Sequence, residues 1–302
     1  MQGLALARDY YHAYRDPLLA PYAAYRPRIA AGLVGLGSEC FGFDDEHSRD
    51  HDFGPGFCLW LHDADYAVIG AALQADYDRL PRTHAGFPAR QGNARSGKRV
   101  GVFSISAFYS QFLGAPELPI SDSDWLQIPE DLLATAVNGE VFEDPSGAFT
   151  AIRKQLQAYY PESIKRLKLA TAAAKMAQRG QYNLPRAVQR GERVTALLAQ
   201  AKFIEHTCRI ALALHGQYAP FYKWLHQCTR GLPSLPNLYT KLDILSQAPA
   251  AGAQAMIEDI CADVLRELIA QGYTRPGNAF LETHVDAILG QSVPSTTQDI
   301  AP

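Results

Sequence analysis

The sequence predicts a small α/β domain followed by an all-α helical bundle. Up to about residue 148, short apolar runs typical of buried strands alternate with amphipathic stretches. From residue 149 onward the apolar residues recur mainly at helical spacing. The chain has 302 residues, of which 47% are hydrophobic and 20% charged, so each half can bury a core of its own. We expect an α/β domain at residues 1–148, a helical domain at 149–290 and a disordered tail at 291–302.

The first half contains two predicted helices and several short strands. Each helix is expected to end at a proline, because proline lacks the N–H that a helix interior needs. The expected helices cover residues 4–15, ended by Pro17, and 66–80, ended by Pro81. The expected strands cover residues 28–35, 57–61 and 100–108. Residues 140–142 add a short strand in a hairpin, with Asn138 and Gly139 as its turn.

The second half is predicted to be helical throughout. The expected helices cover residues 149–159, 161–180, 187–215, 218–229, 236–246, 252–271 and 277–289. In the segment 187–215, Val194, Leu197 and Leu198 begin an apolar face at helical spacing that we expect in the bundle core. The aromatic residues of YAPFYKW, at 218–224, are expected there too.

A polar stretch, GQYNLPRAVQR, separates two of these helices at residues 180–190. It predicts a helix end at Gly180 and a new helix with Pro185 in its first turn. Two interpretations of its polar side chains stay open, helix punctuation and ligand binding. The residues concerned are Gln181, Tyr182, Asn183, Arg186 and Arg190.

The charge and the cysteines restrict the class of protein. The net charge of −3 disfavours a long RNA partner, because phosphate-dominated binding needs many Lys or Arg contacts. The sequence has no apolar run near twenty residues and no basic-then-apolar leader, so we expect no membrane partner and a cytoplasmic location. The five cysteines are scattered and never form C-x-x-C, which favours reduced core thiols over a disulfide-linked partner.

One short stretch, GLGSECFGFDDEHSRDHDFGPGF at residues 35–57, places many charges beside a glycine turn. Gly37 and Ser38 follow the first predicted strand, and Asp50 and Asp52 precede the second. Residues two apart in an extended chain point the same way, so the two aspartates would project side by side. Paired carboxylates suit Mg²⁺, and a Gly-Ser turn can hold phosphate through its hydroxyl and backbone N–H groups.

This layout suits the transfer of a nucleotidyl group from a nucleoside triphosphate. One or two Mg²⁺ ions would neutralise the triphosphate and lower the pKa of the attacking hydroxyl. We expect Asp50 and Asp52 to be the catalytic, metal-binding pair and Gly37 and Ser38 to bind the nucleotide, most simply ATP.

Other interpretations of the charged stretch also stay open. Asp44, Asp45 and Glu46 are expected to form a solvated turn or to cap the short segment before His47. Imidazoles and nearby acids can also hold Zn²⁺ or Fe²⁺, although no H-x₃-H spacing is present. The histidines concerned are His47, His51 and His62.

Gly37-Ser38, eleven further residues and then Asp50-x-Asp52 resemble the signature of the polymerase-β-type nucleotidyltransferase superfamily. From about residue 2 to about residue 250, the chain is similar to an uncharacterised domain-of-unknown-function family of nucleotidyltransferase-like proteins. The similar segments are GLVGLGSECFGFDDEHSRDHDFGPGF, NGEVFEDPSGAFTAIR, YYPE, GQYN and YAPFYKW. The resemblance implies an α+β minimal nucleotidyltransferase domain with a small mixed sheet and then a helical domain, as in aminoglycoside and lincosamide nucleotidyltransferases.

The sequence departs from the superfamily pattern in two places. His51 stands between the aspartates, where many members have an aliphatic residue. Many members also carry a third carboxylate on a later strand, whereas the strand at 100–108 offers only Ser104 and Ser106 at its polar positions. The nearest acids are Glu140, Glu143 and Asp144. We select Glu140 as the third catalytic carboxylate, because it begins a short apolar run and can point inward.

Basic residues of the helical half are candidates for contact with the triphosphate. Lys168 belongs to a basic cluster and Lys223 to YAPFYKW, and each is expected either on a solvated face or at the phosphates. The cluster comprises Arg153, Lys154, Lys165, Arg166 and Lys168. The Gly- and Arg-rich loop at 86–99 is either a mobile lid or an exposed hairpin.

These observations predict a Mg²⁺-dependent nucleotidyltransferase that transfers a nucleoside monophosphate, most simply AMP from ATP, to a hydroxyl. The acceptor is a small molecule, a tRNA end or a protein side chain. The alternative is a non-catalytic nucleotide-binding or regulatory protein, which the missing acid on the third strand favours.

Overall fold

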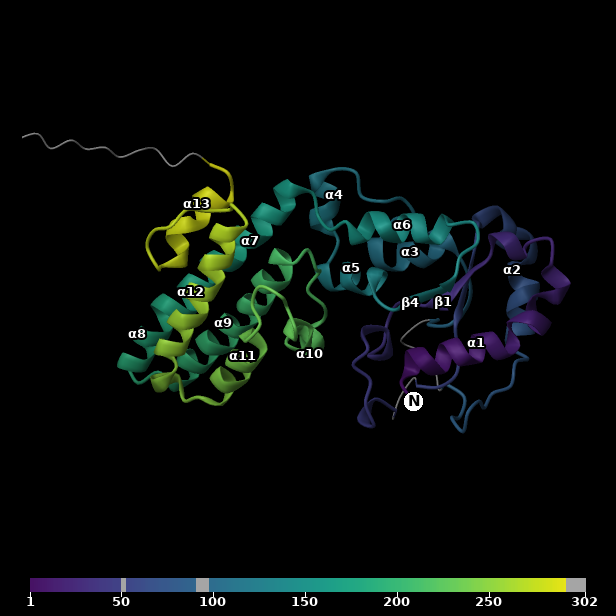
Figure 1. Cartoon of the computed structure of the whole chain (residues 1–302), viewed down its shortest axis with the longest axis horizontal. Coiled ribbons are helices and arrows are strands. Elements are labelled where there is room, and N and C mark those ends of the chain that lie inside the picture. Colours follow the sequence, from purple (N-terminus) through teal and green to yellow (C-terminus); the bar gives the residue numbers. More distant parts are fainter. Residues whose placement is uncertain (50–52, 91–97, 292–302) are drawn as a thin grey trace, which may run out of the picture. The chain divides into compact units, whose positions relative to one another are not determined.

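The structure is a computed structural model that describes residues 1–49, 53–90 and 98–291 (Figure 1). Contacts within the chain divide it into two compact units, Met1–Tyr159 and Tyr160–Pro302. The first unit combines helices with a sheet, and the second is helical. This confirms the expected α+β class with a following all-α region.

The sheet of the first unit is small and mixed, as expected. Its strands are β1 (Ala30–Leu33), β2 (Cys58–Leu61), β3 (Gly101–Ser104) and β4 (Glu140–Glu143). The spatial order is β3-β2-β1-β4, with β1 antiparallel to both β2 and β4 and with β2 parallel to β3. Strand β1 lies between β2 and β4, so the turn that follows it begins between these two strands.

Helices cover both faces of this sheet (Figure 1). They are α1 (Gly3–Leu19), α2 (Asp63–Tyr77), α3 (Ile105–Leu113), α4 (Asp122–Gln127), α5 (Glu130–Val137) and α6 (Ala148–Gln157), with short 3₁₀ turns η1 (Ala20–Tyr22), η2 (Arg26–Arg28), η3 (Glu39–Phe41) and η4 (His47–Arg49). On one face, Tyr11 of α1 and Leu73 of α2 share a core with Leu59 and Leu61. Adjacent strand residues point to opposite faces, so Trp60 lies on the other side.

Trp60 holds α3 and α6 on that second face. Its ring stacks on Phe149 of α6 with the centroids 3.8 Å apart, and it meets Phe108 of α3 edge-on at 5.2 Å. Tyr109 of α3 stacks on Phe149 as well. These contacts explain why the first unit extends to Tyr159, one helix beyond the boundary that we expected at residues 148 and 149.

Three expectations for the first unit were wrong in detail. Helix α1 continues through Pro17 because Leu18 and Leu19 are buried, at 5% and 2% exposure. Strand β3 stops at Ser104, whose hydroxyl accepts the N–H of Ala107 at 3.2 Å and so caps α3. Strand β4 pairs with β1 rather than in a hairpin, since the segment around Asn138 turns towards β1.

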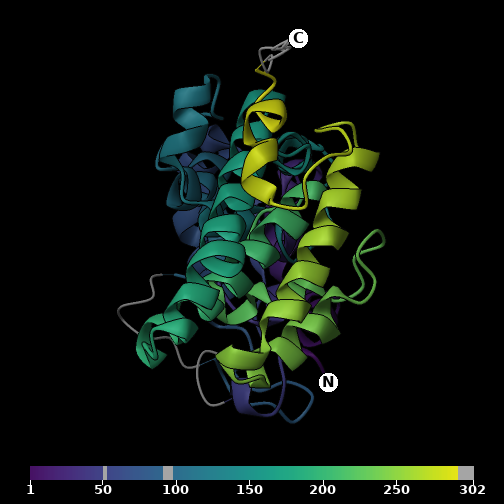
Figure 2. The same cartoon turned by 90° about the vertical axis from the view of Figure 1, so that its left-hand side faces the viewer.

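The second unit consists of helices that lie side by side (Figure 2). They are α7 (Glu162–Met176), the π-helix η5 (Ala177–Asn183), α8 (Leu184–Gln189), α9 (Arg193–Leu214), α10 (Tyr222–Leu225), η6 (Gln227–Thr229), α11 (Leu238–Gln247), η7 (Ala250–Gly252), α12 (Gln254–Ala270), η8 (Leu281–His284) and α13 (Val285–Ile288). Helix α9 packs against α7, α11 and α12. The fully buried Phe203 places α9 at the centre of this unit.

Two expectations for the helical unit were wrong. Val194, Leu197 and Leu198 are 73%, 65% and 60% exposed, because the start of α9 turns its alanine-rich face to the bundle instead. Phe221 and Tyr222 are likewise exposed, at 45% and 73%. Apolar side chains at helical spacing therefore do not all lie in the core here.

Two further expectations concern membranes and thiols. Within the described residues, no helix combines the length and the apolar character needed to cross a bilayer. All five cysteines are free thiols, and four of them are buried. Four of the five therefore lie in the core as expected, and Cys228 is partly buried.

We predict that Phe149→Ala destabilises the chain by about 3–5 kcal/mol, because it removes a fully buried ring from the stack on Trp60. Urea unfolding followed by circular dichroism measures this. The matched control is Leu126→Ala on α4, where the side chain is 50% exposed and the expected change is within about 0.5 kcal/mol. Equal effects of the two substitutions would contradict the packing of α6 into the core of the first unit.

Candidate functional site

The turn that follows β1 is built on two glycines with positive φ angles. Gly35 has φ +121° and Gly37 has φ +130°, a conformation that residues with a Cβ rarely adopt. The side chain of Asn138 holds the first of them: its Oδ1 accepts the Gly35 N–H at 2.9 Å, and its Nδ2 donates to the Gly35 carbonyl at 2.8 Å. The path of the turn is thus fixed by a residue that precedes β4.

Gly37 is also packed too closely to accept a larger residue. A Cβ built there would lie 2.1 Å from Arg99 Nη2 and 2.3 Å from Glu39 Oε2. Ser38 follows, half-buried, and its hydroxyl has no hydrogen-bond partner among the described residues. The turn therefore combines a glycine packed closely against Arg99 and Glu39 with an available hydroxyl.

Glu39 lies directly after this turn and is a buried charge. Its carboxylate accepts a hydrogen bond from Arg90 Nη1 at 2.8 Å and lies 3.5 Å from Arg99 Nη2. The side chains of Glu39, Arg90 and Arg99 are only 5%, 8% and 13% exposed. One buried carboxylate flanked by two guanidinium groups is stable, because each charge has a partner and hydrogen bonds.

The two arginines tie this cluster to other parts of the chain. Arg99 donates to the carbonyl of Leu36 inside the glycine turn, and Arg90 donates to the carbonyl of Gly54 at 3.3 Å. Arg90 and Arg99 of the loop at 86–99 are therefore held by Glu39 and by the carbonyls of Gly54 and Leu36. Residues 91–97 lie outside the described residues, so a mobile lid and an exposed hairpin both stay predictions for this loop.

The segment that follows the aspartate pair reaches the same cluster. A Cβ on Gly3 of α1 would lie 2.5 Å from Glu39 Cβ and 3.2 Å from the Phe53 ring, so Phe53 and Glu39 meet at one point. Asp50 and Asp52, the predicted metal-binding pair, lie outside the described residues, as does His51. Their role stays a prediction.

The cluster brings guanidinium groups to the glycine turn. Arg99 lies beside Gly37, and Arg90 contacts the same Glu39 carboxylate. Both arginines also have interactions besides those with Glu39. Guanidinium groups match the geometry of phosphate oxygens, and binding of a phosphate at this turn stays a prediction.

Other acids of the charged stretch have structural roles. Asp44 accepts the N–H of Gly3 at 2.7 Å, at the positive end of α1. Asp45 accepts hydrogen bonds from the Ser48 hydroxyl at 3.0 Å and from the Ser48 N–H at 2.9 Å, which cap η4 and lower the pKa of Asp45. The expectation that some of these acids cap the segment before His47 is confirmed for Asp45.

The three candidates for a third carboxylate all have partners. Glu140 forms an ion pair with Arg8, and Glu143 accepts from Tyr11 at 2.8 Å and from Arg15. Asp144 accepts the N–H groups of Gly147 and Thr150 at the start of α6. The candidates are Glu140, Glu143 and Asp144.

Glu140 is the candidate nearest to the glycine turn. It pairs with Leu33 at the end of β1, and the N–H of the preceding Gly139 donates to the Cys40 carbonyl of η3 at 2.7 Å. Its side chain is 38% exposed, and its ion pair with Arg8 is partly solvated. Its catalytic role also stays a prediction.

The candidate basic residues divide between the two units. Arg153 of α6 is buried and donates to the carbonyls of Asn138 and Gly139 at 2.7 and 3.1 Å, and burial lowers its pKa. Lys168 lies 5.2 Å from the ring centroid of Tyr160 in the helical unit. Lys223, also in that unit, is exposed and lies over Trp224. Contact of either lysine with phosphate remains a prediction.

Within the described ranges, no three His, Cys, Asp or Glu side chains converge as a metal site. Asp50 and Asp52, the predicted metal ligands, lie outside those ranges. Carboxylate oxygens are suitable ligands for Mg²⁺.

Sequence reasoning missed four residues that organise the turn. They are Glu39, Arg90, Arg99 and Asn138. The Arg-rich composition of the loop at 86–99 was visible, but the burial of its end residues was not. Asn138 precedes Gly139, a pattern that is typical of a turn. That local pattern gives no indication of the hydrogen bonds from its side chain to Gly35, 103 positions away.

Comparisons with known proteins give a family of unknown function. Residues 125–225 match DUF4037, a domain of unknown function. No curated protein matches the chain. Among solved structures, a nucleotidyltransferase-like protein from Exiguobacterium sibiricum is similar, at 15% identity and a TM-score of 0.32, over 86% of this chain and 79% of that one.

We predict that Glu39→Gln destabilises the chain by about 3–5 kcal/mol, since it removes the buried carboxylate that both guanidinium groups contact. Urea unfolding measures the change. The control is Glu117→Gln, an exposed acid of the same unit, with an expected change within about 0.5 kcal/mol. A Glu39→Gln protein as stable as the control would contradict the role of the buried cluster.

Proposed function

We propose that this chain is a Mg²⁺-dependent nucleotidyltransferase that transfers a nucleoside monophosphate, most simply AMP from ATP, to a hydroxyl. The observation that carries the proposal is the Gly37–Ser38 turn, fixed in position by the buried cluster of Glu39, Arg90 and Arg99. The fold class is compatible with this activity but does not by itself identify it.

In this proposal, the turn binds the triphosphate. Gly37 allows a phosphate to approach the backbone, and the Ser38 hydroxyl donates a hydrogen bond to it. Arg99, which already holds the Leu36 carbonyl, adds positive charge beside Gly37. These groups orient the α-phosphorus and complement the pyrophosphate that leaves.

Asp50 and Asp52 are proposed to hold Mg²⁺, which the oxygen donors of this segment suit better than a softer metal. When bound, the ion supplies neutralisation of the triphosphate and a lower pKa of the attacking hydroxyl. The close packing of Gly37 against Arg99 and Glu39 keeps the turn next to a guanidinium group that can complement the phosphates that such an ion accompanies.

The proposed reaction is a displacement at the α-phosphorus. The acceptor oxygen forms a bond to that phosphorus, and the bond from phosphorus to the bridging oxygen of the β-phosphate breaks. Pyrophosphate leaves with the bonding electrons. Glu140 is our candidate to receive the acceptor proton, once its exposed ion pair with Arg8 opens.

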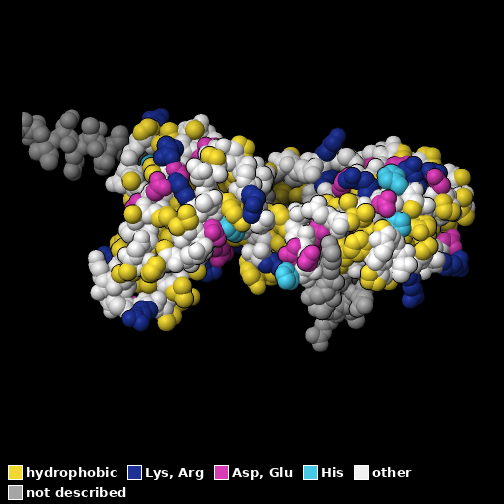
Figure 3. Space-filling view, turned by 60° about the horizontal axis from the view of Figure 1, so that its bottom comes forward, with side chains coloured by type: hydrophobic (Ala, Val, Ile, Leu, Met, Phe, Trp, Pro, Cys, Tyr) yellow, Lys and Arg dark blue, Asp and Glu magenta, His cyan; other side chains and the backbone are white. Residues whose placement is uncertain are grey.

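The acceptor is proposed to be a small molecule or a protein side chain rather than a long RNA. On the face shown in Figure 3, Lys and Arg side chains are scattered among acidic ones instead of forming a continuous basic surface. A tRNA end, which needs fewer phosphate contacts, stays compatible with this surface. The buried free thiols suit a reducing compartment, and we propose a cytoplasmic location.

A second candidate function is nucleotide binding without turnover. This candidate is favoured because the three acids that could serve as the third carboxylate already form ion pairs or hydrogen bonds within the chain. They are Glu140, Glu143 and Asp144. The strand β3 ends in Ser104, which caps α3, and supplies no acid in their place. The two functions share the glycine turn and differ in pyrophosphate release.

We predict that one nucleoside triphosphate raises the thermal stability of the chain in a Mg²⁺-dependent manner. A ligand at about a hundred times its dissociation constant should add about 2.7 kcal/mol. The measurement is a thermal-shift titration with ATP, GTP, CTP and UTP, with and without Mg²⁺. The Asp50→Asn/Asp52→Asn double variant should lose the shift.

The matched control is Glu117→Gln, which should keep the shift. A shift that survives in the double variant would contradict the proposed metal ligands, and no shift with any nucleotide would contradict both functions. Pyrophosphate assayed in the same samples with candidate hydroxyl acceptors separates the two functions. Its release supports transfer, and binding without release supports the non-catalytic candidate.

A further inference from the structure

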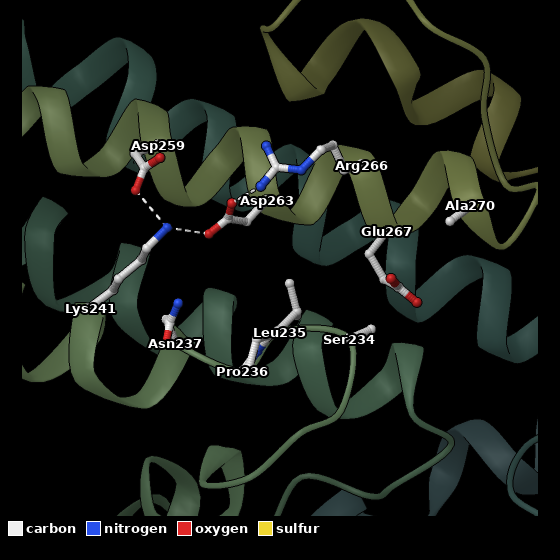
Figure 4. A pocket seen from close by; sticks show the side chains of 10 residues that line it. All are labelled: Ser234, Leu235, Pro236, Asn237, Lys241, Asp259, Asp263, Arg266, Glu267 and Ala270. Carbon is white, nitrogen blue, oxygen red and sulfur yellow. Dashed lines mark hydrogen bonds and ion pairs between the residues drawn. The ribbon is translucent and has the colours of Figure 1, made fainter.

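The helical unit contains two polar pockets that differ in how their charges are paired. The first has a volume of about 480 Å³ and is drawn in Figure 4. There Lys241 lies between Asp259, at 2.6 Å, and Asp263, which also binds Arg266. Because these charges satisfy one another, the pocket has little demand for a charged ligand.

The second pocket, of about 500 Å³, has an excess of positive charge. We call it the arginine pocket. Its lining residues include Arg179, Asn183, Arg186, Arg190, Leu198 and Lys202. Within the described part of the chain, Arg179, Arg186 and Arg190 form no ion pair, and Glu192 is the one acid in the lining. Lys202 is paired with Glu205 at 2.8 Å.

The local structure holds these arginines in one place. The chain passes from α7 into the π-helix η5 instead of ending at Gly180, and α8 then begins with Pro185 in its first turn. Gly180 permits this, because a Cβ there would lie 2.3 Å from the Phe203 ring. The guanidinium of Arg186 lies 3.8 Å from the ring centroid of Tyr182, which fixes its orientation.

An exposed apolar stripe adjoins the arginine pocket. Val194, Leu197, Leu198 and Ala201 follow one another at i, i+3, i+4 and i+7 along α9, and all four are exposed. Leu198 belongs to both the stripe and the pocket lining. We call this set the α9 stripe. Large aliphatic side chains exposed at this spacing on a helix form a surface that a second helix can cover.

We propose that the arginine pocket and the α9 stripe together bind an acidic amphipathic helix of a partner protein. The apolar face of that helix would cover Leu197 and Leu198, and its carboxylates would pair with Arg186 and Arg190. This site is independent of the nucleotide site. Unpaired guanidinium groups beside aliphatic side chains complement Glu or Asp beside Leu or Ile.

Two other occupants fit the surface less well. A second copy of this chain, bound through the same surface about a two-fold axis, would bring the unpaired arginines of both copies together. A nucleic acid would gain from the arginines but would leave the exposed leucines uncovered, and the ring of Tyr182 is already stacked by Arg186. The acidic helix is the occupant that satisfies both features.

The test is fluorescence anisotropy with a labelled synthetic acidic helix, with Leu on one face, Glu on the other and a length of roughly 15–20 residues. We expect saturable binding to the full chain. Leu197→Ser/Leu198→Ser and Arg186→Glu/Arg190→Glu should each weaken binding at least tenfold. The controls Leu126→Ser and Arg275→Glu, at exposed sites elsewhere, should leave it unchanged.

Several outcomes would overturn the proposal. They are no binding of the probe, equal binding by all variants, and equal binding of a probe of the same composition in scrambled order. Tighter binding of vesicles containing anionic lipid, or of a single-stranded oligonucleotide, would assign the surface to a membrane or to nucleic acid. Self-association lost in Leu197→Ser/Leu198→Ser would assign it to a second copy. Circular dichroism of each variant verifies that it is folded.

Discussion

The buried contact of Glu39 with Arg90 and Arg99 is the interaction on which the candidate site depends. It joins the turn after β1, the segment that leads into β2 and both described ends of the loop at 86–99. A charge group this well buried persists only when every member has a partner. The cluster therefore fixes the path of three chain segments that are distant in sequence.

The rest of the first unit supports this cluster from two sides. Helix α1 contacts β4 through Arg8 and Arg15, which bind Glu140 and Glu143. Asn138 fixes Gly35, and Arg153 in turn fixes the carbonyl of Asn138. A turn held in this way is preorganised, so a phosphate can bind without the loss of much conformational freedom.

The sequence predicted the parts of the fold that depend on local patterns. Buried runs identified β1 and β2, and the change to helical spacing identified the second unit. It did not predict that Pro17 lies inside a helix, because the burial of Leu18 and Leu19 is a tertiary effect. Nor did it reveal Glu39, whose partner Arg90 lies 51 positions away in the chain. The exposure of Leu198 was not predicted either, because helical periodicity identifies an apolar helix face but not whether another element packs against that face.

The measurement that tests the central claim most directly is hydrogen–deuterium exchange of the full chain with and without Mg²⁺ and ATP. If the turn held by Glu39 binds the triphosphate, amide exchange should slow in residues 36–39, because bound phosphate accepts hydrogen bonds from their N–H groups. Slowed exchange confined to the helical unit, with residues 36–39 unchanged, would contradict the account.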